Sequence, residues 1–342
     1  LLLPILGLVL LVGAAGGLYP AFYLSRFQPA QVLKANKSSA EAQGSGRLRN
    51  ALVVAQFAVS IGLIVCTAVV YAQTVHARTA DPGYKRQGLL QIENVGRREM
   101  TPVIETLKRE IKAVDGVTSV GLTGIGINTG NNSETLVYLP GSGEGIDTDV
   151  YTVDADFFET MGIERVAGRL FDENRPADDS TTPFPEDPVA EKALVARGMN
   201  VVVNELAARR MGFRSPQEAV GKQIERSWAD EYGGMMPTTI IGVVEDSRFR
   251  SVHEPIDPIT FSFQRFGQSW MVVRYDAANP GAVRREIESV WKEVAPTVPF
   301  EAKFSEEVIG EIYEAEEARA QTFAAFALLA IVVACLGLFG LA

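Results

Sequence analysis

The sequence predicts α-helical transmembrane segments joined to an α+β extracytoplasmic domain. Three observations lead to this fold class: long apolar blocks, an uneven distribution of charge, and a β-α-β order that occurs twice. The apolar blocks are residues 1–24, 51–75 and 322–342. Because a helix needs about 20 apolar residues to cross a bilayer core, each block is long enough, or nearly so, to span a membrane.

The rest of the chain is organised around the block at 51–75. No charged side chain lies between Arg49 and His76, and the polar Gln56, Ser60 and Thr67 can be satisfied inside a helix bundle. The block at 1–24 could instead be a secretory signal peptide, but it has neither a basic start nor a small-residue cleavage site. We therefore expect 1–25 and 50–75 to be transmembrane helices, separated by a linker at 26–49.

Charge gives the orientation of these helices. The net charge is −10, yet the chain up to Val75 holds five basic residues (Arg26, Lys34, Lys37, Arg47, Arg49) and one acid, Glu41. Lys and Arg collect in short cytoplasmic loops, whereas long domains cross regardless of charge. The linker is therefore predicted to be cytoplasmic and residues 76–319 extracytoplasmic. An acidic domain without a basic patch also excludes nucleic acid as a partner.

The outer segment contains no cysteine, since Cys66 and Cys335 both lie in apolar blocks. No disulfide can therefore hold it. With about 240 residues it is long enough to fold around a hydrophobic core of its own.

The β-α-β order appears at 89–127 and again at 268–304. The first unit has strands at Leu89–Asn94 and Val117–Leu122, and a helix that Thr101 and Pro102 are expected to open. The second has strands at Met271–Tyr275 and Phe300–Phe304, and a helix opened by Asn279 and Pro280. The apolar stripes of the two helices are Val103, Ile104, Leu107, Ile111 and Val114 in one and Val283, Ile287, Val290, Trp291 and Val294 in the other. We expect one subdomain, a small sheet covered by two helices.

Residues 128–267 read as an inserted mixed α+β subdomain. Its expected strands are Thr135–Leu139, Val150–Val153, Val201–Val203, Thr238–Val244 and Ile259–Phe263, and its expected helices Asp156–Met161 and Glu205–Met211. The Pro- and Asp-rich stretch Asn174–Asp187 shows no periodicity and is expected to be a mobile exposed loop. From Ser305 to Ala342 no proline occurs, so a stalk helix at 305–319 is predicted to continue into a transmembrane helix at 320–342.

The chain shows no pattern typical of an active site. It has no G-x-x-x-x-G-K-[ST] loop for ATP, no G-x-S-x-G elbow, and only two isolated histidines, His76 and His253. Two carboxylate pairs, Asp154 with Asp156 and Glu245 with Asp246, could serve acid–base chemistry or bind calcium, but a helix cap explains Asp156 more simply. We therefore predict no catalytic, cofactor-binding or metal-binding residue.

Several stretches resemble a known family when taken in order. They are Tyr19–Ala35, Leu48–Val65, residues 81–92, Asp154–Phe171, residues 201–213, residues 218–224, Ile240–Phe249 and residues 313–342. In this order and spacing the chain resembles the permeases of MacB/FtsX-type ABC transporters. Because it begins with Leu1 and ends inside an apolar run, we expect it to be the centre of a long permease with two FtsX-type halves. Residues 1–25 would then end the first module and 320–342 begin the second.

The resemblance implies a MacB-like periplasmic domain at 76–319 in the cytoplasmic membrane of a bacterium. It implies a separate ABC ATPase that binds ATP, and movement of the outer domain for export or efflux. Further implied partners are membrane lipid, a second permease half or a homodimer partner, and a periplasmic adaptor or outer-membrane exit protein. Positions that match the family are Gly168, Arg169, Asn204, Glu205, Gly221, Gly242 and Asp246, all with structural roles. A membrane-anchored sensor or receptor is the alternative function, and an anchored extracytoplasmic enzyme the third.

Overall fold

The computed structural model describes Gly7, Ala14 and residues 45–339, with gaps at 130–132, 142, 184–185, 230–231 and 233. The predicted span at 1–25 and most of the linker therefore lie outside the described residues. The chain divides into two compact units, one formed by residues 1–63 and 326–342 and the other by Ile64–Ala325. The second unit contains the whole outer domain.

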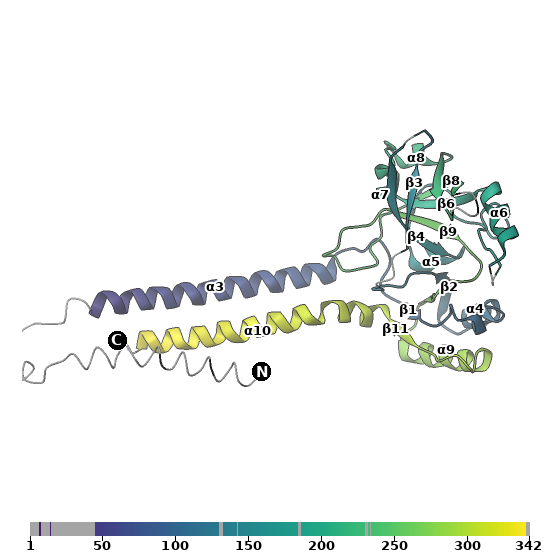
Figure 1. Ribbon diagram of the computed structural model, residues 1–342. Helices are drawn as coiled ribbons and strands as arrows, with labels where there is room; N and C mark the ends of the chain where they lie inside the picture. Colours follow the sequence, from purple (N-terminus) through teal and green to yellow (C-terminus); the bar gives the residue numbers. More distant parts are fainter. Residues whose placement is uncertain are drawn as a thin grey trace, which may run out of the picture. The chain divides into compact units, whose positions relative to one another are not determined.

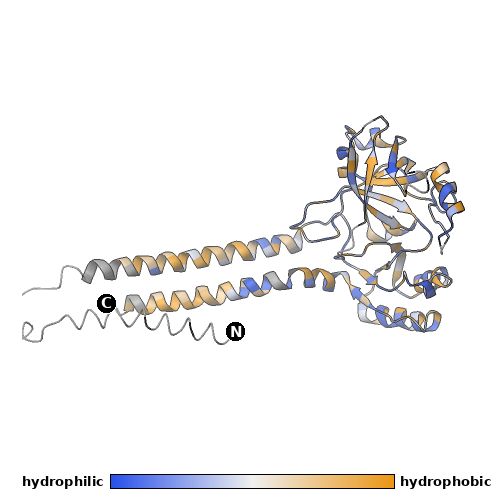
Figure 2. Ribbon diagram, in the orientation of Figure 1, coloured by the Kyte–Doolittle hydropathy of each residue, from blue (hydrophilic) through white to orange (hydrophobic). Residues whose placement is uncertain are grey.

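Two long helices enter both units. Helix α3 runs from Ser45 to Thr79 and α10 from Ser305 to Phe339. Each contains a stretch, Val53–Ala77 or Glu317–Leu336, that is long and apolar enough to cross a membrane. Figure 2 shows hydrophobic residues along most of both helices. The continuous helix predicted from Ser305 is confirmed as far as Phe339, and α3 begins inside the segment predicted to be a linker.

Within the first unit the two helices contact each other through small side chains. Ser60 Oγ donates to the carbonyl oxygens of Gln56 at 2.9 Å and Ala330 at 3.4 Å, and Ala327 and Ala334 are buried. Small residues allow helices to approach closely, which is typical of helix pairs in membranes.

The two β-α-β units interleave in one sheet. The strands are β1 (Leu89–Ile92), β2 (Val117–Thr123), β10 (Trp270–Tyr275) and β11 (Ala302–Phe304), and the helices are η1 (Arg98–Met100), α4 (Ile104–Lys112) and α9 (Pro280–Val294). The order is β11-β1-β10-β2 with every neighbouring pair antiparallel, so each unit leaves a gap that a strand of the other fills. This is a ferredoxin-like split β-α-β arrangement. Helices α4 and α9 contact each other, and α4 also contacts β2 (Figure 1).

One hydrophobic core holds this four-stranded part together. Leu107 of α4 and Trp291 of α9 are fully buried in the same cluster, and Val290 packs against it. The prediction that both units share one sheet and one core is therefore confirmed. Asn279 caps α9 as predicted, since its side chain accepts from the backbone N–H of Ala282 at 3.1 Å.

The inserted part is built on a closed ring of strands. Its strands are β3 (Glu134–Tyr138), β4 (Gly145–Val153), β5 (Arg165–Gly168), β6 (Met199–Asn204), β7 (Gln223–Ser227), β8 (Met235–Val244) and β9 (Ile259–Phe263). Hydrogen-bonded pairs run β4-β3-β7-β8-β6-β9, and β9 pairs with β4 to close the ring, while β5 pairs with β8. The helices are α5 (Phe157–Met161), α6 (Pro188–Arg197), α7 (Glu205–Arg210) and α8 (Pro216–Ala219).

A central cluster of buried residues joins the two parts of the domain. It contains Phe157 and Phe158 of α5, Phe261 of β9 and Leu89 of β1. Helix α5 lies so close to β2 that a Cβ on Gly121 would be 2.9 Å from the Cα of Phe157. Glycine is therefore required at 121 for this contact.

The structure corrects several sequence-based predictions. Thr101 does not cap α4, because η1 precedes the helix and Val103 occupies the cap position without a side-chain bond. Asp156 makes no capping bond to α5. Strands β5 and β7 and helices α6 and α8 were not predicted, because they are short and lack a clear apolar period.

Candidate functional site

The outer domain meets α3 and α10 at a junction that we describe from its residues upward. Helix α3 ends at Thr79, and residues 80–88, here called the exit loop, lead to β1. Arg86 folds back and donates to the carbonyl oxygen of Ala80. Gly83 has a φ of +74°, and a Cβ at this position would lie 2.1 Å from the carbonyl oxygen of Asp246. The exit loop can therefore take this path only with glycine at 83.

Tyr84 anchors the exit loop in the central cluster. Its ring is buried and stacks on Phe249, with centroids 5.6 Å apart and planes 10° apart. Burial raises the pKa of the Tyr84 hydroxyl well above its usual value, so the ring stays neutral. Offset-stacked aromatic pairs add about 0.5–1.5 kcal/mol to the burial of their surface.

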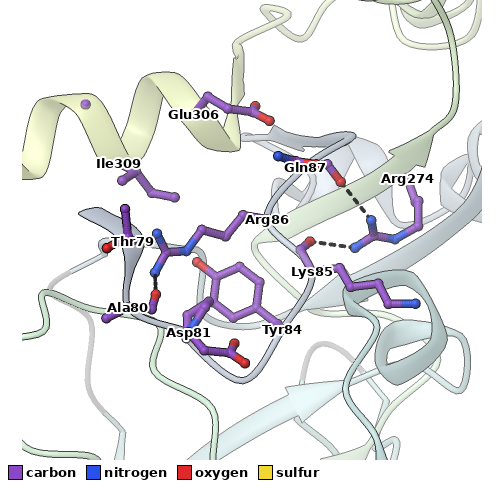
Figure 3. A pocket seen from close by; sticks show the side chains of 12 residues that line it. Thr79, Ala80, Asp81, Tyr84, Lys85, Arg86, Gln87, Arg274, Glu306 and Ile309 are labelled. Carbon is purple, nitrogen blue, oxygen red and sulfur yellow. Dashed lines mark hydrogen bonds between the residues drawn. The ribbon is translucent and has the colours of Figure 1, made fainter. Parts of the chain in front are cut away.

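Arg274 of β10 fastens the exit loop to two other elements. Its guanidinium donates to the carbonyl oxygens of Lys85 at 2.8 Å and Gln87 at 3.0 Å (Figure 3). It also donates to the carbonyl oxygen of Thr160 at 2.5 Å. Thr160 lies in α5 and is fully buried, so Arg274 also satisfies a carbonyl near the end of that helix. Burial lowers the pKa of Arg274, which nevertheless remains charged.

Residues 245–253, here called the junction segment, follow β8 and contact the exit loop. The backbone N–H of Arg248 donates to the carbonyl of Pro82 at 2.7 Å, and Ser247 Oγ donates to the carbonyl of Gly83 at 2.9 Å. Further along, the N–H of Val252 donates to the Tyr313 hydroxyl of α10 at 3.1 Å. A single segment of the inserted part therefore contacts both the end of α3 and the start of α10.

Helix α10 starts without a linker. Strand β11 ends at Phe304, pairs with β1, and is followed directly by Ser305, the first residue of α10. The N–H of Phe304 donates to the carboxylate of Glu307 at 3.0 Å. Val308 belongs to the central cluster, and Tyr313 is buried. The first turns of α10 are thus fixed to the sheet, to the central cluster and to the junction segment.

A cavity of about 810 Å³ lies between the exit loop and the first turns of α10 (Figure 3). Asp81, Lys85 and Arg86 line it from the loop, and Glu306 and Ile309 from the helix. Gly310 also lines it, and a Cβ there would meet nothing within 4 Å. The cavity carries charges of both signs and leaves room beside α10 where the helix leaves the domain.

The glycines that match the family lie together along β8. Gly168 has a φ of +70°, and a Cβ there would be 2.3 Å from the carbonyl oxygen of Ile241. A Cβ on Gly242 would be 2.1 Å from the carbonyl oxygen of Arg169. Gly221 has a φ of +80° and donates its N–H to the carbonyl of Ile240 at 2.7 Å. These positions allow close backbone packing between β5, β8 and the turn before β7.

The polar family positions support α7 and the loop after β5. Asn204 is fully buried, and its side-chain oxygen accepts from the N–H groups of Ala207 at 3.0 Å and Ile259 at 2.8 Å. Glu205 is the first residue of α7. Asp246 accepts from the N–H of Leu206 at 2.7 Å and pairs with Arg209 at 2.6 Å. Asp246 therefore links the start of α7 to the junction segment.

The prediction for the stretch Asn174–Asp187 requires a correction, and Arg169 takes part in holding this stretch. Arg169 forms two bonds to the fully buried Asp178, at 2.5 and 2.8 Å. Ser180 is also buried, and its N–H and Oγ both donate to the carbonyl of Phe263. The stretch is therefore anchored at 178–181, where it was expected to be exposed, whereas the described residues 174–177, 183, 186 and 187 are exposed. The composition of the stretch did not predict this anchoring, because the residues that hold it lie elsewhere in the chain.

Both predicted carboxylate pairs have basic partners in the structure, since Asp246 pairs with Arg209 and the other two share one lysine. Asp154 and Asp156 both pair with the Lys108 ammonium of α4, at 2.6 and 2.7 Å. Among the described residues, no group of three or more His, Cys, Asp or Glu side chains could hold a metal ion. Lys108 instead ties α4 to the connection between β4 and α5.

Sequence reasoning missed Arg274, Tyr84 and Tyr313, which carry most of the junction contacts. One signal was available: Arg274 interrupts an otherwise apolar strand, WMVVRY. A charged side chain in a buried strand must find partners for its donors. The two tyrosines carry no such signal, because buried tyrosines are common in cores.

The type of domain is identified by a family model. The sequence profile of the MacB-like periplasmic core domain matches residues 52–290. No match was found among curated proteins.

Three solved structures are similar at 14% identity. The periplasmic region of MacB from Actinobacillus actinomycetemcomitans gives a TM-score of 0.41 and covers 67% of this chain and 94% of that one. The extracellular domain of the noncanonic ABC-type transporter YknZ from Gram-positive bacteria gives 0.39, with 63% and 99% covered. A domain of a permease protein from Porphyromonas gingivalis gives 0.40, with 65% and 92% covered.

Proposed function

The chain belongs to the MacB-like periplasmic core domain family of MacB/FtsX-type permeases, and from this we propose that it couples ATP hydrolysis to movement of its outer domain. A separate ABC ATPase would hydrolyse the ATP on the cytoplasmic side. Helices α3 and α10 would cross the membrane and carry the motion outward. The outer domain would then act on a substrate for export or efflux.

The observation that carries this proposal is the double contact of the junction segment. It bonds to Pro82 and Gly83 after α3, and to Tyr313 of α10. A relative shift of the two helices would therefore act on one segment, which directly follows β8 and is bonded to α7 through Asp246. An anchor that only held the domain at a membrane would need no such shared contact.

The stiffness of α10 supports the same proposal. The helix has 35 residues and, at about 1.5 Å per residue, is about 52 Å long. It follows β11 without an intervening residue. A tilt at its apolar end would therefore act directly on the edge of the four-stranded sheet.

The proposed location is the cytoplasmic membrane of a bacterium, with residues 76–319 outside the cytoplasm. The uneven charge supports this orientation, because only one acidic residue precedes position 76. Among the proposed partners are the ATPase, membrane lipid, and a second permease half or a second copy of this chain.

The experiment that tests the proposal breaks α10 and follows the cavity beside it. Gly-Pro replaces Ala315-Glu316, which costs a helix interior about 1 kcal/mol for glycine and about 3 for proline. Gly310→Cys, in a chain without Cys66 and Cys335, reports on the cavity through its rate of labelling by a membrane-impermeant maleimide. The chain is purified together with the proposed ABC ATPase partner.

We expect ATP to change the labelling rate several-fold in the intact helix and not in the Gly-Pro variant, although both bind the ATPase and both hydrolyse ATP. Glu316→Ala is the matched control and should behave as the intact helix. An equal ATP response in all three variants would show that α10 is not the transmitter. Absence of any ATP response in the intact helix would favour a sensor instead.

A further inference from the structure

A second cavity lies away from the junction, between the two parts of the outer domain. It measures about 470 Å³, within the usual range of about 300–1,000 Å³ for ligand sites. Its first wall comes from the four-stranded part, at Gly96 and Thr101. Its second wall comes from the inserted part, at Thr181 and Thr182, and Phe266 lies beside them. We refer to this cavity as the threonine cleft.

Buried ion pairs hold the second wall in place. Asp178 is fully buried and accepts four hydrogen bonds: two from Arg169, one from Asn200 Nδ2 at 2.7 Å and one from the N–H of Asp172 at 3.1 Å. These bonds lower the pKa of the Asp178 carboxyl, although burial alone would raise it. The carboxylate therefore stays charged and fixes the chain three residues before Thr181.

The next residues continue this support up to the cleft itself. Asp179 accepts from the N–H of Thr181 at 2.9 Å and from Arg265 Nε at 2.6 Å. The N–H of Arg265 in turn donates to Thr181 Oγ1 at 2.8 Å. Thr181 is thus held from both sides, and the wall it belongs to is preorganised. A preorganised wall loses little entropy when a ligand binds.

Two exposed glycines line the cleft, and one of them, Gly96, packs closely against residues 268 and 269. Gly267 has a φ of +99°, a conformation that other residues rarely adopt. A Cβ on Gly96 would be 3.1 Å from the carbonyl oxygen of Gln268 and equally close to the Cα of Ser269. The cleft therefore combines bare backbone, threonine hydroxyls and the amide of Gln264 with the apolar surfaces of Phe266 and Pro183.

We propose that the threonine cleft binds an extended peptide segment of a protein partner. Hydroxyl, amide and backbone groups on facing walls can both donate and accept, as the alternating N–H and C=O groups of an extended peptide require. The apolar surfaces would take one side chain of the peptide. This site is independent of the proposed coupling to an ATPase, because it lies in the outer domain alone.

The lining argues against other ligand classes. Arg98 and Glu186 are the only charged residues that line the cleft among the described residues, and their charges cancel, so a phosphate or nucleotide would find no cationic cluster. A stretch of three or four residues would fill the volume, whereas a folded surface would not enter it.

The test uses the purified full chain in detergent and a random library of N-acetylated, C-amidated hexapeptides as the probe. Peptides retained by the wild type are identified, and their Kd values are then measured one by one. Thr182→Trp fills the cleft and should weaken binding at least about tenfold, equivalent to about 1.4 kcal/mol. Thr297→Trp, at an exposed turn, is the matched control and should leave Kd unchanged.

A second variant protects the test against misfolding. Thr101→Trp fills the cleft from the opposite wall, where the side chain is exposed, and should weaken the same peptides. The melting temperatures of all variants are compared first. Loss of binding in a cleft variant that melts like the wild type, with the Thr297 variant unaffected, supports the site. Failure to retain any peptide, or equal binding by folded cleft variants, would overturn it.

Discussion

Replacing Arg274 by alanine should loosen the exit loop and destabilise the outer domain. The guanidinium bonds to three carbonyl oxygens, those of Lys85, Gln87 and Thr160. Among the described residues, Arg274 is the only one in β10 whose side chain donates to these three oxygens. The substitution therefore removes two bonds between β10 and the exit loop and one between β10 and α5. Two main-chain bonds remain, from Tyr275 to Gly88 at 2.8 Å and from Lys85 to Met161 at 2.9 Å.

The three bonds contribute unequally. Thr160 is fully buried, so its carbonyl would lose its partner without gaining water, which costs about 1–3 kcal/mol. Lys85 and Gln87 are exposed, so their carbonyls would be rehydrated at a cost of about 0.5–1.5 kcal/mol each. Together these give a loss of about 2–6 kcal/mol. The loss is reduced because the guanidinium no longer has to be buried.

Thermal unfolding of the full chain in detergent measures this loss. At about 2–4 °C per kcal/mol, a loss of about 2–6 kcal/mol should lower Tm by about 4–24 °C. Arg274→Lys keeps the charge but cannot reach three carbonyls, and should fall between the wild type and alanine. Arg285→Ala, at an exposed position of α9, is the control and should change stability by less than about 0.5 kcal/mol.

The rates of amide hydrogen exchange show whether Arg274 stabilises the exit loop alone or the outer domain as a whole. The N–H of Lys85 donates to the carbonyl of Met161 at 2.9 Å. In Arg274→Ala this amide and its neighbours in the exit loop should exchange faster, while amides of β8 change little. Unchanged Tm together with unchanged exchange in the exit loop would refute the role assigned to Arg274.

Three further predictions concern the core, pH and orientation. Leu107→Ala should cost about 2–5 kcal/mol in chemical unfolding, because Leu107 is fully buried, whereas Val189→Ala at 76% exposure should be nearly neutral. Burial, together with the charge of Asp257, raises the pKa of Asp149 to about 6, and Arg250 at 3.4 Å offsets this only in part. The protonated form is thus favoured by folding, so stability should fall as pH rises from about 4 to 6; Asp149→Asn should flatten this fall in Tm, and an unchanged slope would contradict it. For orientation, Ser39→Cys should be shielded from an impermeant thiol reagent in intact cells while Val189→Cys reacts; the reverse labelling would exclude the proposed topology.

Local patterns were enough to predict the four-stranded part. Its two helices show apolar residues at helical spacing, and Asn279 with Pro280 marks the start of α9. The repeated order of strand, helix and strand then allowed the two units to be placed in one sheet. Their interleaving was not predicted, because periodicity does not say which strand lies next to which.

The inserted part was predicted less well, and β7 and α6 show why. Strand β7 reads QIERS, with only one apolar side chain, and its Arg226 is buried although charged. Helix α6 has no separate apolar face, since both a glutamate and two aliphatic residues of it are buried. In both elements, residues distant in the sequence determine which side chains are buried. The spacing of hydrophobic residues therefore says little about whether the element is a helix or a strand.

The junction was the least predictable feature, because most of its bonds use the main chain. Arg248 and Val252 contribute their backbone N–H groups, and any residue except proline could supply the same donor. Gly83 differs, because its φ is positive and a Cβ at this position would lie 2.1 Å from the carbonyl oxygen of Asp246. Both features exclude a side chain there. Tyr313 differs as well, since its hydroxyl accepts the bond from Val252. Within the junction segment, Ser247 and Phe249 also contribute side chains, to Gly83 and Tyr84. The contact between the exit loop and α10 therefore depends on a few specific residues, Gly83, Ser247, Phe249 and Tyr313, and at its other bonds on main chain that many residues could supply.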